Sequence, residues 1–194
     1  DINLNEIEKI YITASGGPFL DLHHSKLNKV TLKDALKHPI WKMGNKITID
    51  SATMMNKVFE VIEAKNIFEL GYQQISILVH PKSYLHSIVK FNNGIIKILL
   101  HEPNMKIPIH NSIYSLKKGI KTKSLNLDIL NNLELKSIDR KKFPLVKILF
   151  NLPKENSLYE TALVTINDYF VMKFLNKKID FYNLLKLTNK YANF

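Results

Sequence analysis

An apolar stripe at helical spacing constrains the fold of this chain more than any other feature. Apolar side chains recur every three or four positions between residues 54 and 70, and the stripe ends at Gly71, a residue type that commonly follows the last turn of a helix. An apolar run at residues 7–13 precedes the stripe and reads as a buried strand. The pattern predicts a helix that follows a strand, as in α/β domains.

Three more apolar runs follow the stripe and predict the rest of a sheet. They cover residues 75–79, 85–91 and 95–100. The Asn92-Asn93-Gly94 segment between the last two predicts a hairpin on an Asn-Gly turn. We therefore expect an α/β (α+β) central domain with a small mixed sheet at residues 1–114.

The rest of the chain predicts helices. Residues 115–140 are rich in Lys, Asn and Leu without a clear period, and we interpret them as a linker or peripheral element. Helical spacing returns at residues 143–152 and 159–175, and a third helix is expected at 181–191. The expected ending is thus an incomplete all-α helical domain at residues 141–194.

The first turns of the striped helix have the features of a phosphate site. Asp50 and Ser51 stand where an N-cap belongs, and the free N–H groups of a helix N-terminus attract anions. Lys57 adds a positive charge on the helical face that it shares with Asn56 and Glu60. The residues alone leave an alternative open, namely a well-capped amphipathic helix with a Lys–Glu surface pair.

A second candidate anion loop is Ser15-Gly16-Gly17, which follows the first strand. Glycine permits close approach of the backbone to a ligand, and the serine hydroxyl can donate a hydrogen bond. Most loops of this kind are only turns, so the segment by itself predicts little.

Residues 21–46 are polar and loop-like, with one helical turn expected near residues 32–36. They carry His38, Trp41 and Met43 without a regular period. An indole in such a segment either packs back on its own domain or closes over a ligand as part of a mobile flap, and both interpretations stay open.

The strongly basic charge balance comes from lysine. The formal net charge is +11, yet of the 28 basic residues only Arg140 is an arginine. Arginine supplies most bidentate recognition of bases and phosphates. We therefore expect no nucleic-acid partner. A nucleic-acid-binding protein would instead present a lysine-dense face and bind with a steep dependence on salt.

Several classes of site are excluded or weakened. Cysteine is absent, which excludes disulfides, thiolate metal sites and a cysteine nucleophile. No run of about 18 apolar residues could span a bilayer, so we expect no membrane partner. Glu60 and Glu63 lie on one helix, whereas Mg²⁺ sites need carboxylates from different elements. His80 and His86 border predicted strands and are interpreted as satisfied core residues.

Three motifs follow one another along the first sixty residues. They are TASGGPF at 13–19, KHPIWKMG at 37–44, and KITIDSATMMNK at 46–57 with Glu60. In this order and spacing they resemble the 1-deoxy-D-xylulose 5-phosphate reductoisomerases. The resemblance covers residues 10–110 and weakens after Tyr114; Leu20 and Lys82 stand where the family usually has arginine and glutamine.

The resemblance implies an NADPH- and Mg²⁺- or Mn²⁺-dependent oxidoreductase and isomerase of the non-mevalonate isoprenoid route. Such an enzyme rearranges the carbon skeleton of 1-deoxy-D-xylulose 5-phosphate and reduces it to 2-C-methyl-D-erythritol 4-phosphate. The resemblance also implies a homodimer formed through the central sheet, in the cytoplasm of a bacterium or in a plastid-type organelle.

The resemblance further assigns roles to residues that match the family's motifs. Metal binding falls to Glu60, and the substrate phosphate would be held by Ser15, Ser51, Asn56 and Lys57. The complete substrate-binding set is Ser15, His38, Trp41, Ser51, Asn56, Lys57 and Glu60. The residues expected near the cofactor are Gly16, Met43 and Met105, and those expected to act in catalysis are Glu60, Lys57 and His38.

The chain begins at Asp1 without an initiator methionine, so we expect it to be an excerpt of a longer protein. The family's NADPH-binding domain and two further metal carboxylates would precede residue 1, and the excerpt alone is expected to be inactive. The alternative is a non-catalytic phosphate-binding remnant of the same family.

Overall fold

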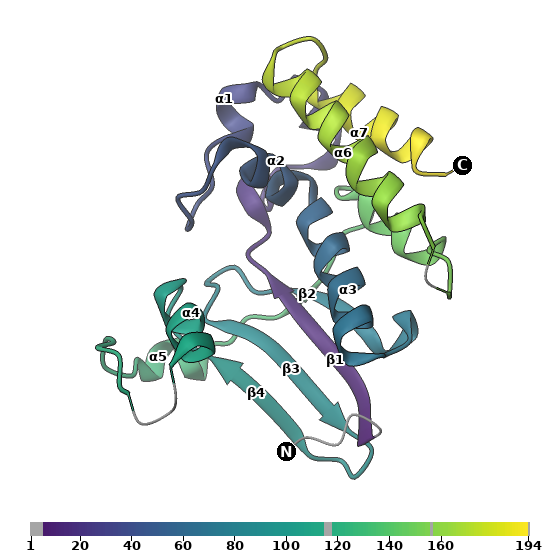
Figure 1. Ribbon diagram of the computed structural model, residues 1–194. Coiled ribbons are helices and arrows are strands. Elements are labelled where there is room, and N and C mark those ends of the chain that lie inside the picture. The colour runs from purple at the N-terminus through teal and green to yellow at the C-terminus, as the bar shows by residue number, and fades with distance from the viewer. Residues whose placement is uncertain (1–5, 115–117, 156, 194) are drawn as a thin grey trace.

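The chain folds around a small mixed sheet, with α3 on one face and further helices beyond the end of β1 (Figure 1). The computed structural model describes residues 6–114, 118–155 and 157–193. The five strands of its sheet lie in the order β4-β3-β1-β2-β5. β1 and β2 are parallel and the other neighbours are antiparallel, which confirms the predicted mixed sheet. The strands are β1 (Ile7–Ala14), β2 (Ile75–Val79), β3 (Leu85–Phe91), β4 (Ile96–Leu100) and β5 (Lys136–Ser137).

The helix predicted after Asp50 is interrupted, and two helices stand in its place. Helix α2 spans Asn45–Thr53 and α3 spans Met55–Phe68, and Met54 between them has a left-handed φ of 63°. The predicted N-cap at Asp50 and Ser51 was wrong, because both residues lie in the later turns of α2. Apolar spacing does not reveal this break, since Met54 is as deeply buried as the helical residues around it.

Two hydrophobic clusters hold these elements together. The first lies between the sheet and α3. The second joins α2 and α3 to the C-terminal helices α6 (Tyr159–Leu175) and α7 (Phe181–Tyr191). In this cluster the rings of Phe19 and Phe181 pack edge to face with centroids 5.0 Å apart. The N-terminal third of the chain and its last two helices therefore share one core, while the domain boundaries proposed from the sequence stay a prediction.

The bounds of α6 and α7 agree with the sequence prediction, but other elements differ. Residues Pro144–Phe150 form a 3₁₀ helix where an α-helix was expected, because apolar spacing over so short a segment does not distinguish the two. The predicted linker contributes β5, which pairs with Leu78 and Val79 of β2. The remaining helices are α1 (Leu32–Ala35), α4 (Lys106–Ile113), α5 (Leu127–Asn131) and the 3₁₀ helices Gly17–Phe19, His24–Lys29 and Tyr72–Gln74.

Helix α1 lies where the sequence predicted a helical turn, whereas α4 was not predicted. In the part of the chain that the structure describes, no helix combines the length and apolarity needed to cross a membrane.

Candidate functional site

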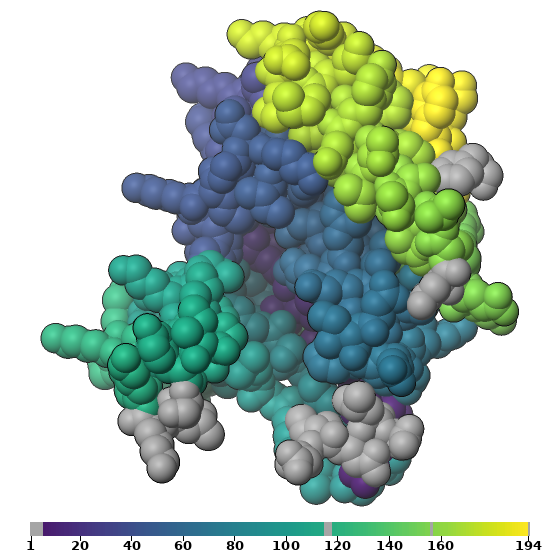
Figure 2. Space-filling view, viewed as in Figure 1, coloured from purple at the N-terminus to yellow at the C-terminus, as the bar shows by residue number. Residues whose placement is uncertain are grey.

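A cavity of about 440 Å³ opens where β1 ends, between the α2–α3 junction and the start of α4. In Figure 2 the surface is hollowed between the blue segment that contains α2 and α3 and the teal segment that contains α4, with purple residues at its floor. Every residue that the sequence analysis assigned to the site lines this cavity: Ser15, Gly16, His38, Trp41, Met43, Ser51, Asn56, Lys57, Glu60 and Met105.

The glycine loop after β1 lies directly against α2. Gly16 and Gly17 both have positive φ, at 96° and 63°. A Cβ atom at Gly17 would stand 2.9 Å from the backbone oxygen of Ser51, so only glycine permits this approach. The loop thereby brings Ser15 to the same cavity as Ser51, and the Ser15 hydroxyl accepts a hydrogen bond from the Gly17 N–H at 3.3 Å.

His38 joins the flap segment to this loop. Its Nδ1 accepts hydrogen bonds from the backbone N–H groups of Ile40 (3.2 Å) and Trp41 (2.9 Å), so the ring proton resides on Nε2. Nε2 lies 3.2 Å from the Ser15 Oγ and donates to it. Burial lowers the pKa of His38, which keeps the imidazole neutral in this arrangement.

The first turns of α3 place a cation and a carboxylate side by side on the cavity wall. Lys57 Nζ lies 2.9 Å from Oε1 and 2.8 Å from Oε2 of Glu60. The Lys57 side chain is 15% exposed and that of Glu60 is 38% exposed, so the pair is partly shielded. Asn56 adds an amide whose Oδ1 is buried and has no hydrogen-bond partner among the described residues. Together they offer an anion and a cation adjacent binding positions.

Backbone amides at the start of α3 contribute less than the sequence suggested. The Met55 N–H points to Thr53 Oγ1 at 3.4 Å, and the N–H groups of Lys57 and Val58 donate to the Met54 carbonyl. These donors are used within the helix break. Side chains, rather than a free helix N-terminus, therefore supply the charged groups of the cavity wall.

His86, which no sequence motif assigned to the site, also lines the cavity. Its ring stacks on His101 at 3.6 Å, and Nε2 lies 3.1 Å from the His101 carbonyl oxygen. Burial lowers the pKa of His86 to about 4, so the ring is neutral near pH 7 and donates this bond. Its Nε2 is hydrogen-bonded, as expected from the sequence, but the ring lies at the cavity wall and not in the core. Thr13, Ala14, Ile47, Met54, Ser83 and Leu85 complete the lining.

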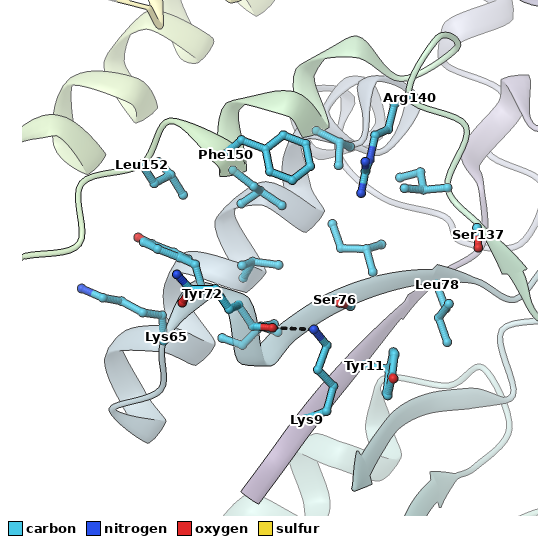
Figure 3. Close-up of a pocket in the computed structure, with 18 of the residues that line it drawn as sticks. Lys9, Tyr11, Lys65, Tyr72, Ser76, Leu78, Ser137, Arg140, Phe150 and Leu152 are labelled. Carbon is cyan, nitrogen blue, oxygen red and sulfur yellow. Dashed lines mark hydrogen bonds between the residues drawn. The ribbon is translucent and has the colours of Figure 1, made fainter.

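A larger cavity of about 1060 Å³ lies beside β1 and β2 and contains none of the assigned residues (Figure 3). The Lys9 ammonium donates to the Gln73 carbonyl, and the Arg140 guanidinium lies 4.6 Å from the centre of the Phe150 ring. Asp139 accepts hydrogen bonds from two backbone N–H groups of the adjoining turn. These charged groups are engaged in local contacts, so the smaller cavity is the stronger candidate site.

Comparison with known proteins finds matches over most of the chain. A family model described as the 1-deoxy-D-xylulose 5-phosphate reductoisomerase C-terminal domain matches residues 1–68, and one described as the DXP reductoisomerase C-terminal domain matches residues 100–193. A 1-deoxy-D-xylulose 5-phosphate reductoisomerase of Pelagibacter ubique is 59% identical over 190 residues, 97% of this chain. The chain belongs to the 1-deoxy-D-xylulose 5-phosphate reductoisomerase family.

The chain spans about half the length of the curated relatives it matches. It covers 49% of the Pelagibacter ubique protein and 48% of the Clostridium tetani reductoisomerase, which is 42% identical over 94% of this chain.

Solved reductoisomerases share the fold. A DOX-P reductoisomerase in complex with NADPH, fosmidomycin and magnesium matches 97% of this chain with a TM-score of 0.88 and 36% identity, and 46% of that structure is covered. The Zymomonas mobilis enzyme in complex with NADPH matches 98% of this chain with a TM-score of 0.86 and 33% identity, and 49% of it is covered.

Proposed function

We propose that this chain is the substrate-binding part of an NADPH-dependent reductoisomerase. The enzyme would convert 1-deoxy-D-xylulose 5-phosphate to 2-C-methyl-D-erythritol 4-phosphate in non-mevalonate isoprenoid biosynthesis. The observation that carries the proposal is the convergence of all the motif-matched residues on one cavity, although they come from four separate segments. Their individual roles remain part of the proposal.

The substrate phosphate would lie among Ser15, Ser51, Asn56 and Lys57. Two hydroxyls, an amide and an ammonium provide the hydrogen-bond donors that a dianion needs, and contacts from a charged donor are the strongest of these. Asn56 would donate to the phosphate through Nδ2, whereas its buried Oδ1, which has no hydrogen-bond partner among the described residues, is an acceptor and would take a donor such as a substrate hydroxyl.

Glu60 would supply one ligand to Mg²⁺ or Mn²⁺, for which a carboxylate is a suitable hard oxygen donor. In the described ranges no three His, Asp or Glu side chains come close enough to hold a metal ion. We therefore propose that the other carboxylates belong to a further part of the whole enzyme, and that this chain alone is inactive. A divalent cation bound there would polarise the substrate's carbonyl and hydroxyl oxygens.

The flap residues would close the cavity over bound substrate. His38 is neutral and donates to Ser15, so it can align that hydroxyl beside the phosphate while Trp41 covers the ligand. Met43, Met105 and Gly16 would face the nicotinamide of NADPH, and an apolar cover of this kind excludes water before hydride transfer.

Trp41 is the only tryptophan in the chain, which makes flap closure measurable. In a full-length reductoisomerase whose other tryptophans are replaced by phenylalanine, substrate binding is expected to shift or quench Trp41 emission, because the indole leaves water for a closed site. A titration monitored by fluorescence measures this change. An emission spectrum that is indifferent to saturating substrate would instead favour a loop packed on its own domain.

We also propose a homodimer formed through the central sheet. Ile96, Ile98 and Leu99 on edge strand β4 are 56%, 48% and 56% exposed, and an exposed apolar edge strand favours pairing with another surface. Neither nucleic acid nor membrane is part of this proposal. The proposed location is the bacterial cytoplasm, or a plastid-type organelle in a eukaryote.

A spectrophotometric assay of NADPH oxidation tests the proposed activity directly. A full-length protein that contains this chain is expected to oxidise NADPH, followed at 340 nm as its characteristic absorbance, only when both 1-deoxy-D-xylulose 5-phosphate and Mg²⁺ are present. Omission of either component is the matched control. Substrate binding without any NADPH oxidation would contradict the enzyme proposal and favour the non-catalytic phosphate-binding alternative.

A further inference from the structure

A network of polar side-chain contacts joins α2 to α6 outside the cavity. Asn167 Nδ2 donates to Asp50 Oδ1 at 2.8 Å. Lys46 Nζ lies 2.8 Å from Asp50 Oδ2 and 2.8 Å from Asp168 Oδ1, and it also lies 5.6 Å from the centre of the Phe59 ring on α3. These four polar side chains therefore connect α2, α3 and α6.

The end of this network formed by Asp50 and Asn167 is buried. The Asp50 side chain is 1% exposed, and Asn167 is 1% exposed. Burial raises the pKa of Asp50, while the contacts from Asn167 and Lys46 act in the opposite direction. A buried carboxylate held by hydrogen bonds contributes little net stability, and fixing one geometry is the best attested use of such groups.

Asp50 is directly connected to the cavity through the backbone. The next residue, Ser51, lines the cavity, and its carbonyl accepts the Met54 N–H at 3.2 Å and lies against Gly17. The Asp50 carbonyl accepts the Thr53 hydroxyl at 3.2 Å. A rotation of the last turn of α2 would therefore move Ser51, the glycine loop and the start of α3 together.

We propose that the Asp50–Asn167 contact is a positioning device for the reaction. It holds the last turn of α2 so that Ser51 and the first turn of α3 keep the orientation that the substrate phosphate requires. Lys46 and Asp168 form the outer, half-exposed end of the same device. Asp50 and Asn167 do not line the cavity and act through Ser51, so the inference rests on the proposed phosphate-binding role of that residue.

The test exchanges the two partners in a full-length reductoisomerase that contains this chain. Asp50→Asn and Asn167→Asp each remove the carboxylate–amide pair, and the double variant restores it in reverse. Misplacement of a binding group by about 1 Å can cost up to about a hundredfold, so each single variant is expected to raise the KM for 1-deoxy-D-xylulose 5-phosphate about tenfold. The double variant is expected to recover at least half of this loss on a logarithmic scale, with the KM for NADPH unchanged throughout.

Glu8→Gln is the matched control, because Glu8 is a carboxylate paired with Lys90 at 2.6 Å on the exposed sheet. Its KM is expected to equal that of the wild type. If the single variants lower the thermal midpoint but leave the substrate KM unchanged, the contact is only structural and the proposal is overturned. If Asp50→Asn does not fold, Asp168→Asn at the half-exposed end takes its place, with an expected rise in substrate KM of about threefold. An unchanged KM in that variant also overturns the proposal.

Ser51→Ala separates this inference from the proposed function. A raised substrate KM in Ser51→Ala, with wild-type values in all the Asp50, Asn167 and Asp168 variants, would overturn the positioning role alone. A wild-type KM in Ser51→Ala would overturn the phosphate assignment itself.

Discussion

Replacing Glu60 by glutamine in a full-length reductoisomerase is expected to lower turnover at limiting Mg²⁺ by about a hundredfold. Even the loss of an indirect contact to a metal costs about ten- to a hundredfold in affinity or activity, and Glu60 is proposed as a direct ligand. The fold should persist, because the side chain is 38% exposed and its contact with Lys57 is an i,i+3 pair. Such pairs contribute only about 0.3–0.5 kcal/mol to the free energy of unfolding.

Turnover measured against Mg²⁺ concentration checks this expectation. The variant should require a higher Mg²⁺ concentration for half-maximal activity, because the remaining ligands bind the cation more weakly. Glu63→Gln is the matched control, since Glu63 lies one turn further along α3, is exposed and does not line the cavity. Equal activity of the Glu60 variant and the wild type at limiting Mg²⁺ would reduce Glu60 to a helix-surface residue.

Lys57→Ala is expected to weaken substrate binding by about ten- to a hundredfold. A charge-assisted contact to phosphate contributes about 1.5–3 kcal/mol, and the Lys57 ammonium is the only cation among the cavity-lining side chains assigned to the phosphate. Without substrate, the ion pair that Lys57 forms among the described residues is with Glu60, so its removal should change the thermal midpoint very little. The two interpretations that the sequence left open therefore predict different results.

The measurements are the substrate KM at fixed Mg²⁺ and NADPH, and the thermal midpoint without ligand. Lys65→Ala provides the control, because Lys65 lies on the same helix but lines the other cavity. A wild-type substrate KM in Lys57→Ala would contradict the phosphate-binding role and favour a surface ion pair between Lys57 and Glu60.

The sequence predicted the regular elements well where apolar periodicity was long. The four longer strands and helices α6 and α7 were expected at nearly their observed positions, since each carries a run of apolar residues or an apolar stripe at helical spacing. The break at Met54 was not predictable in this way, because a methionine with left-handed φ carries no turn signature. The two-residue strand β5 is too short for any period to show.

The candidate site depended on motif resemblance more than on local pattern. Residue spacing alone placed Asn56, Lys57 and Glu60 on one helical face, but it favoured a surface ion pair over a phosphate site. The structure brings this face to the same cavity as Ser15 and His38. The partner of Asp50 could not be foreseen, because Asn167 lies 117 residues away along the chain. The roles of the cavity residues stay predictions until they are measured.

Lys57 and its neighbours are proposed to bind the phosphate of the substrate rather than its sugar carbons. The most direct measurement compares kcat/KM for 1-deoxy-D-xylulose 5-phosphate and for unphosphorylated 1-deoxy-D-xylulose in the wild-type full-length enzyme and in Lys57→Ala. We predict that the variant loses about ten- to a hundredfold with the phosphorylated substrate and almost nothing with the unphosphorylated one, because only the first presents a dianion to the lysine. An equal loss with both substrates, or no loss with either, would contradict the phosphate site.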